Sequence, residues 1–223
     1  VIMSFKNAVN VSVIVALGLI FSGCVYDDDP VDLVVGDYRP SPQISSERCE
    51  LETARPTTSS RSGYPCEWFP PSSVERGWTA IIIHHSATDN GNATIFDRWH
   101  REGRNWDGIG YDFVIGNGSD SRDGEVEVTF RWKQQRTGAH CGGTPGNWAN
   151  RKGIGICMVG NFDKARPPPR QLKSLHRLVS FLQKRYNIPT SRVYGHGQTP
   201  GANSTSCPGK YFPMRKFKDS LSH

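Results

Sequence analysis

The stretch "IIIHHSAT" at residues 81–88 constrains the fold of this chain more than any other. Three β-branched residues in a row, bounded by turn residues, predict a short buried strand, because the run is too brief for a core helix. The run ends in His84 and His85, and buried imidazoles require a hydrogen-bonding partner or a metal. Since successive strand residues point to opposite faces of a sheet, we expect His84 and His85 on opposite faces.

Six further segments carry the patterns of regular secondary structure. Thr94 and Asp97 are spaced as a capping box, with Ile95, Phe96 and Trp99 on one helical face. We expect helices at residues 94–104 and 167–189, and strands at 110–118, 125–132, 153–162 and 192–198. This order predicts the α/β or α+β class, with a single mixed β-sheet and flanking helices.

The amino-terminal residues indicate a compartment. Residues 1–23 combine Lys6 with an apolar run at 11–21, which is typical of a secretory signal and too short to span a bilayer. "FSGC" resembles a bacterial lipobox, which implies cleavage before Cys24 and lipidation of Cys24. The alternative is an uncleaved apolar anchor. Because Val25 follows and not aspartate, the resemblance implies a lipid-anchored protein of the bacterial cell envelope, on the outer membrane if the cell is Gram-negative.

Residues 24–73 are rich in Pro, Ser, Thr and charge without periodicity, which predicts a flexible tether that packs little. Within it, Cys49 and Cys66 are either a disulfide formed in an oxidising compartment or two unpaired thiols. The folded domain is expected at 77–223. Residues 1–76 carry six Lys/Arg against ten Asp/Glu, whereas the rest of the chain carries 21 against 11. The basic part predicts either an anionic partner (nucleic acid, membrane or cell-wall polymer) or only a solvated surface.

Four side chains capable of binding a metal follow predicted strands or lie in loops: His84, His140, His196 and Cys207. Two imidazoles and a thiolate from separate loops make a zinc shell, and three protein ligands leave the fourth tetrahedral position for water. The chain has no HExxH and no CxxC pair. The residue pattern alone therefore leaves zinc as one of several interpretations.

Five motifs in a fixed order resemble the type 2 family of N-acetylmuramoyl-L-alanine amidases. They are "IIIHHSAT", "GIGYDFVIGNG", "TGAHCGG", "GIGICMVGNF" and "YGHGQ" followed by "TSCPG". The family includes phage lysozyme-amidases and peptidoglycan recognition proteins, and the resemblance covers residues 77–214. It implies a zinc amidase fold that hydrolyses the amide between N-acetylmuramic acid and L-alanine of peptidoglycan.

The resemblance implies a role for each matching residue. His84, His196 and Cys207 are implied to be the zinc ligands. Tyr111 matches the family tyrosine beside the metal and is expected to donate to the developing oxyanion. Thr205, where some relatives have lysine, is expected to steady the attacking water or the oxyanion.

Other residues keep open alternatives. His140 is expected either to face the groove and bind substrate or assist, or to make only structural hydrogen bonds. Cys157 stands where cytoplasmic relatives have glutamate and is expected to be a core thiol. The loop residues Asn147, Trp148 and Asn150 are expected to line the sugar or peptide groove.

The remaining cysteine and histidines carry weaker expectations. His85 is expected in the core or behind the metal site, and His100 and His176 at helix surfaces. Cys141 is left without a role. The four extra residues "PGAN" between His196 and Cys207 are expected to bulge outward without displacing the sulfur.

Two rival functions stay open beside the amidase. One is a non-catalytic peptidoglycan receptor, which the presence of Cys207 and Tyr111 disfavours. The other is a cysteine hydrolase that uses Cys207 and His196 as nucleophile and base. We expect a monomer that binds peptidoglycan or muropeptides and the membrane through its lipid, and that does not bind nucleic acid.

Overall fold

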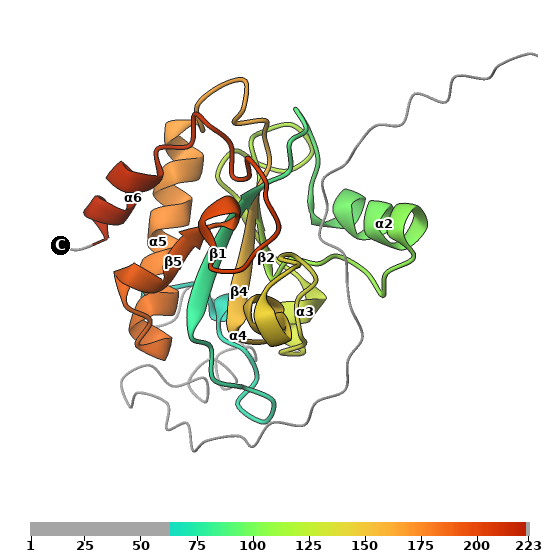
Figure 1. The fold of residues 1–223 in the computed structure, drawn as a ribbon, viewed down its shortest axis with the longest axis vertical. Helices are drawn as coiled ribbons and strands as arrows, with labels where there is room; N and C mark the ends of the chain where they lie inside the picture. The colour runs from blue at the N-terminus through green and yellow to red at the C-terminus, as the bar shows by residue number, and fades with distance from the viewer. Residues whose placement is uncertain (1–62, 222–223) are drawn as a thin grey trace, which may run out of the picture.

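The computed structural model describes residues 63–221, which build one mixed five-stranded sheet (Figure 1). The strands lie in the order β3-β2-β4-β1-β5; β3 pairs antiparallel with β2, and all other pairs are parallel. Their bounds are β1 Ala80–His85, β2 Phe113–Ile115, β3 Val126–Val128, β4 Gly153–Met158 and β5 Val193–Gly195. The predicted fold class, a single mixed sheet with flanking helices, is confirmed.

Helices and short 3-10 turns connect and cover these strands. The α-helices are α2 Ala93–Arg104, α3 Phe130–Lys133, α4 Trp148–Lys152, α5 Pro169–Tyr186 and α6 Met214–Ser220. The 3-10 turns are η1 Cys66–Trp68, η2 Pro145–Asn147, η3 Thr190–Arg192 and η4 His196–Gln198.

Strand β1 lies between β4 and β5, and every one of its residues is buried. Burial on both faces explains why the strand has no polar residue before its two final histidines. Side chains alternate between the faces, so that Ile81 and Ile83 pack in the large core cluster and Ile82 in a smaller one on the opposite face. His84 shares the face of Ile82, and β1 therefore holds this imidazole on a rigid, fully paired backbone.

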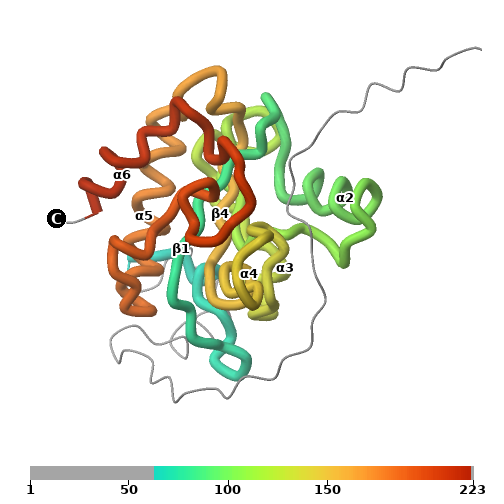
Figure 2. The backbone as a smooth tube through the Cα atoms, in the orientation of Figure 1, coloured from blue at the N-terminus to red at the C-terminus, as the bar shows by residue number. Residues whose placement is uncertain are grey.

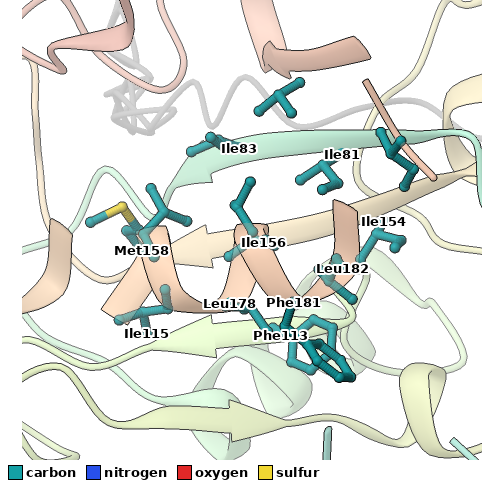
Figure 3. Close-up of a cluster of buried hydrophobic side chains, with 14 of the residues drawn as sticks. Ile81, Ile83, Phe113, Ile115, Ile154, Ile156, Met158, Leu178, Phe181 and Leu182 are labelled. Atoms are coloured by element: carbon teal, nitrogen blue, oxygen red, sulfur yellow. The ribbon is translucent and has the colours of Figure 1, made fainter. Parts of the chain in front are cut away.

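Helix α5 covers the first of these faces. Its apolar stripe packs on the isoleucines of β1 and β4 (Figure 3). The labelled side chains of this core are Ile81, Ile83, Phe113, Ile115, Ile154, Ile156, Met158, Leu178, Phe181 and Leu182. Burying one such side chain stabilises the fold by about 1.5–3 kcal/mol. The core thus gives the strands that carry the histidines a stiff support.

The opposite face of the sheet is covered more thinly. Helix α4 packs on Ala80 and Ile82 through Ala149, whereas α2 stands out to one side of the body (Figure 1). The segment that follows β5, drawn in red, passes close in front of β1 and β4 (Figure 2). This arrangement leaves the carboxyl end of β1 between α2 and the red segment.

Two predicted elements differ in their ends. Asn92, not Thr94, caps α2: its side chain accepts a hydrogen bond from the Ile95 N–H at 2.8 Å. The expected strand at 125–132 ends at Val128, because the chain turns into α3 and places Trp132 in the core. Alternation of polar and apolar residues predicted the strand, but the indole of Trp132 reaches its partners from a helical turn.

The prediction that residues 24–73 pack little is wrong for the described part of that segment. Trp68 is 3% exposed and Phe69 is also buried, and both rings pack against Phe181 of α5. Trp132 also donates its indole N–H to the Trp68 carbonyl at 3.0 Å. The packed domain therefore begins well before residue 77.

Other predictions about the amino-terminal part fall on residues outside the described range. These are the signal at residues 1–23, the lipidation of Cys24 and the pairing of Cys49 with Cys66. Between residues 63 and 221, no helix is both long and apolar enough to cross a bilayer.

Candidate metal centre and groove

Three side chains capable of binding a metal converge from separate parts of the chain. His84 ends β1, His196 begins η4 directly after β5, and Cys207 lies in the following loop. One candidate ligand atom from each residue lies within 4.8 Å of the other two. Among residues 63–221 this is the group of His, Cys, Asp and Glu side chains that has the geometry to hold a metal ion.

The distances agree with a tetrahedral zinc site. The Nδ1 atom of His84 lies 3.6 Å from the sulfur of Cys207. Zinc–nitrogen bonds of about 2.05 Å and zinc–sulfur bonds of about 2.3 Å in a tetrahedron imply a nitrogen–sulfur separation of about 3.6 Å. The imidazole rings of His84 and His196 have centroids 4.6 Å apart. The donor set of two imidazoles and one sulfur therefore fits zinc.

Burial keeps these imidazoles neutral, which is the protonation state that binds a metal. Burial, followed by the neighbouring imidazoles of His196 and His140, lowers the pKa of His84 well below its ordinary value. Burial also lowers the pKa of His196 to about 4, with a smaller contribution from His85. At neutral pH each ring thus has a lone pair to donate.

The backbone of β1 also supports the third ligand. The N–H of His85 donates to the sulfur of Cys207 at 3.4 Å, which favours the thiolate. The His85 ring is buried on the opposite face, where its Nδ1 accepts from the Phe162 N–H. The expectation that His85 lies behind the metal site is confirmed. Pro200 is exposed within the four extra residues before Cys207, and the sulfur stays beside His84.

Tyr111 and Thr205 lie at the same site. The Tyr111 ring packs against the His84 ring, with centroids 5.2 Å apart, and both residues line one groove with Thr205. The Thr205 hydroxyl oxygen accepts from the Cys207 N–H at 3.2 Å. Tyr111 also makes a hydrogen bond with Cys157, a fully buried thiol whose pKa burial raises well above its ordinary value. Cys157 is a core residue, as expected.

The groove has a volume of about 1020 Å³, and α2 with the loop after it forms one of its walls. The sequence analysis missed this wall. It placed Trp99 on a buried helical face and His100 at an ordinary surface, but Trp99 is 42% exposed and both residues line the groove. Arg104 and Trp106 continue the wall, with the guanidinium 5.4 Å from the indole centroid. The wall therefore combines aromatic surface with positive charge.

A helical signal for this wall was present in the sequence. Phe96, Trp99, His100 and Gly103 follow one another at three- and four-residue steps and share one face of α2. The same spacing describes a core-facing stripe. Only the position of α2 beside the metal site decides that this stripe faces a groove.

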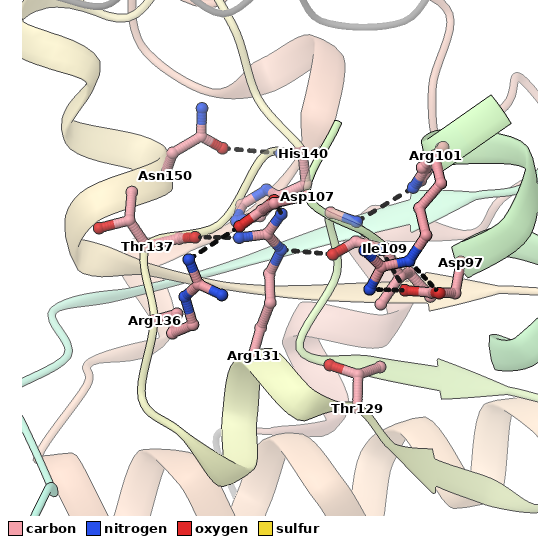
Figure 4. A network of polar contacts seen from close by, with 12 residues as sticks. Asp97, Arg101, Asp107, Ile109, Thr129, Arg131, Arg136, Thr137, His140 and Asn150 are labelled. Carbon is pink, nitrogen blue, oxygen red and sulfur yellow. Dashed lines mark hydrogen bonds and ion pairs between the residues drawn. The ribbon is translucent and has the colours of Figure 1, made fainter. Parts of the chain in front are cut away.

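Three predicted substrate contacts lie elsewhere. Asn150 is 2% exposed, and its amide bonds the backbone of His140 and Cys141 and the side chain of Asn147, so the expected contact with substrate is wrong for Asn150 (Figure 4). Trp148 packs on Tyr194 and donates to the Pro200 carbonyl. Neither Asn147 nor Trp148 lines the groove beside His84.

The fold and the site together define a class: an α/β domain with a His–His–Cys cluster at the floor of an open groove. The family model for N-acetylmuramoyl-L-alanine amidases matches residues 75–210. The chain therefore belongs to the N-acetylmuramoyl-L-alanine amidase family.

Individual relatives agree with this assignment. A peptidoglycan-recognition protein of Drosophila simulans is 29% identical over 143 residues, which is 59% of this chain and 68% of the relative. Peptidoglycan-recognition protein SC2 of Drosophila melanogaster is 31% identical over 137 residues, 57% of this chain and 66% of the relative. The solved N-acetylmuramoyl-L-alanine amidase LysC from Clostridium intestinale URNW has a TM-score of 0.54 at 29% identity, covering 66% of this chain and 86% of LysC.

Proposed function

We propose that this chain is a zinc-dependent amidase that hydrolyses the bond between N-acetylmuramic acid and L-alanine in peptidoglycan. The observation that carries the proposal is the convergence of His84, His196 and Cys207 at the floor of an open groove. Three protein ligands are typical of catalytic zinc sites, whereas structural sites use four. When bound, zinc lowers the pKa of a coordinated water from about 15.7 to about 7 and polarises the substrate carbonyl.

The chain's own residues supply the remaining functions. The Tyr111 hydroxyl, beside His84, donates a hydrogen bond to the carbonyl oxygen as it gains negative charge. Thr205 accepts the Cys207 N–H and keeps its own hydroxyl hydrogen for a second partner in the groove. The α2 wall holds the substrate, with Trp99 and Trp106 as apolar surfaces for the sugar or peptide.

The charge of the domain supports a peptidoglycan substrate. Residues 77–223 carry 21 Lys/Arg against 11 Asp/Glu, and peptidoglycan stem peptides carry carboxylates. Arg104 places one of these cations in the groove wall.

We propose further that the protein is tethered to the cell envelope by lipid on Cys24. The support is the sequence of residues 1–24, with its apolar run and "FSGC". Intact-mass measurement of the membrane-bound protein tests this: a mass that begins at Cys24 plus lipid supports the anchor, and a chain that retains residues before Cys24 refutes it.

Digestion of purified peptidoglycan tests the activity. The parent chain should release stem peptides with new L-alanine amino termini, detected by mass spectrometry and amino-terminal labelling. His84→Ala and Cys207→Ala should abolish the release. His176→Ala, which removes a histidine from α5 outside the groove, should retain it.

Chelation separates the amidase from its rivals. Activity that is lost on zinc removal and restored by added zinc supports the metal-dependent reaction. A cysteine hydrolase would stay active after chelation, and a receptor would bind peptidoglycan without releasing peptides. Either outcome would refute the proposed function.

A further inference from the structure

His140 lies between a metal-ligand candidate and the backbone of β4. It is 3% exposed, its Nδ1 lies 3.1 Å from Nε2 of His84, and its Nε2 lies 3.3 Å from the carbonyl oxygen of Gly153. Both ring nitrogens thus face protein atoms. This arrangement differs from both sequence-based alternatives, which were a substrate contact and an isolated structural histidine.

The chemistry of the three groups determines which atom donates. A carbonyl oxygen only accepts, so Nε2 of His140 carries its proton and donates to Gly153. A neutral imidazole has one N–H, so Nδ1 of His140 accepts, and Nε2 of His84 must be the donor. The lone pair of His84 is then on Nδ1. Nδ1 is the atom that lies 3.6 Å from the Cys207 sulfur.

Two glycines make room for the His140 ring. A Cβ atom on Gly155 would lie 2.4 Å from Cδ2 of His140, and one on Gly138 would lie 2.5 Å from the same atom. Contacts this short do not occur between real side chains. The ring is therefore held in a slot that only glycine permits on both sides.

Polar contacts hold the backbone on either side of this ring (Figure 4). The Asn150 side-chain oxygen accepts from the N–H of His140 at 2.8 Å. The buried guanidinium of Arg131 donates to the carbonyls of Thr137 and Ile109. Arg131 thus ties the loop before His140 to the segment that leads to Tyr111. The ring has little freedom to rotate away from His84.

We propose that His140 is a positioning residue that holds His84 in the Nε2-protonated tautomer, with Nδ1 directed at the metal. The proposal rests on the zinc site of the proposed function. A histidine that ligates a metal is commonly held through its other nitrogen, usually by a carboxylate, a carbonyl or water, and loss of that partner weakens metal binding by about 10–100-fold. Here a second imidazole takes that place and passes the contact on to Gly153.

Zinc affinity tests the proposal directly. The full chain and its His140→Ala and His140→Asn variants are stripped of metal, and their zinc dissociation constants are measured by competition with a chelating dye. We expect His140→Ala to bind about 10–100-fold more weakly. His140→Asn should retain most of the affinity, because its side-chain oxygen can accept from His84 near the position of Nδ1.

His100→Ala is the matched control. His100 is a histidine of the same groove that bonds the Gly110 N–H and is not hydrogen-bonded to His84, so its loss should leave zinc affinity unchanged. Thermal unfolding of each metal-free variant separates a weakened fold from a weakened site. Equal zinc affinity of the parent and His140→Ala would overturn the positioning role.

Nitrogen-15 spectra of the zinc-loaded parent chain give an answer that needs no variant. Long-range proton–nitrogen correlations should show His84 protonated at Nε2, and protonation at Nδ1 would overturn the proposal. A parent chain that binds no zinc refutes the metal site of the proposed function, and the positioning role with it. That result is distinguishable from equal affinities, which refute the positioning role alone.

Discussion

The Nδ1 atom of His84 and the sulfur of Cys207 lie 3.6 Å apart although 123 residues separate them in the chain. The two residues meet because the parallel pairing of β5 with β1 brings the segment after β5 past the carboxyl end of β1. The N–H of His85 then holds the sulfur at 3.4 Å. The same strand end thus supplies one ligand and fixes another.

Replacement of a ligand should remove the metal without unfolding the domain. Cys207→Ser exchanges a soft sulfur for a poorly ionised hydroxyl, so zinc affinity should fall by more than about 100-fold, beyond the loss typical of an outer partner. Activity should fall with it. Cys66→Ser, the same chemical change in η1 outside the groove, should keep both. Zinc content measured by elemental analysis after dialysis checks this.

Tyr111→Phe isolates the hydroxyl from the ring. The ring contacts with His84 and His100 remain, so the fold and substrate affinity should change little. Loss of one donor to a developing oxyanion costs about 10²–10³ in kcat. Steady-state kinetics on a soluble muropeptide would show kcat lowered with KM nearly constant. A parent-like kcat would exclude the hydroxyl from the reaction.

Acid should destabilise the metal-free domain through His100. Burial, together with Arg104 and Arg131, lowers the pKa of His100 to about 4, against a partial opposing effect of Asp97. In the unfolded chain its pKa is about 6.5. The unfolded state therefore binds more protons between these values, and stability falls as the pH drops from about 6.5 to about 4.

His100→Asn measures this contribution. The asparagine oxygen can still accept from the Gly110 N–H but does not titrate. Between pH 6.5 and pH 4 the variant should lose about 3 kcal/mol less unfolding free energy than the parent, at about 1.4 kcal/mol per pKa unit. Urea unfolding of metal-free protein across this range gives the comparison. Parallel curves for parent and variant would contradict the assignment.

The segment before residue 70 should stabilise the domain. Trp68 and Phe69 are buried against α5, and replacing a buried Trp or Phe with Ala costs about 3–5 kcal/mol. A chain of residues 70–223 should therefore unfold at lower urea concentration than one of residues 63–223. Trp68→Ala in the longer chain should reproduce much of the loss. Identical unfolding midpoints for the two lengths would contradict this role.

The fold class could be predicted because its signals are local. The isoleucine run of β1 and the leucine stripe of α5 each reflect the burial of one strand or one helix face, and the structure places both in the core. The three ligand candidates were also found, although through family motifs and not through their spacing. Cys207 illustrates the limit, because no local pattern relates it to His84.

The errors in the sequence analysis share a cause. Trp99 on α2 and Asn150 on α4 carry the same local patterns whether they face a groove or a core. Trp68 lies in a stretch whose composition is that of a tether. Which surface each residue meets depends on contacts with residues that are distant in sequence.

The sequence by itself determined the type of each element, the order of the motifs and the identity of the ligand side chains. Tertiary structure alone decided that His140 contacts His84 and not substrate, that α2 forms the groove wall, and that Trp68 belongs to the core. The physical reason is range. Periodicity and capping act over a few residues and can be read from them, whereas the meeting of loops depends on how the whole sheet and its helices pack.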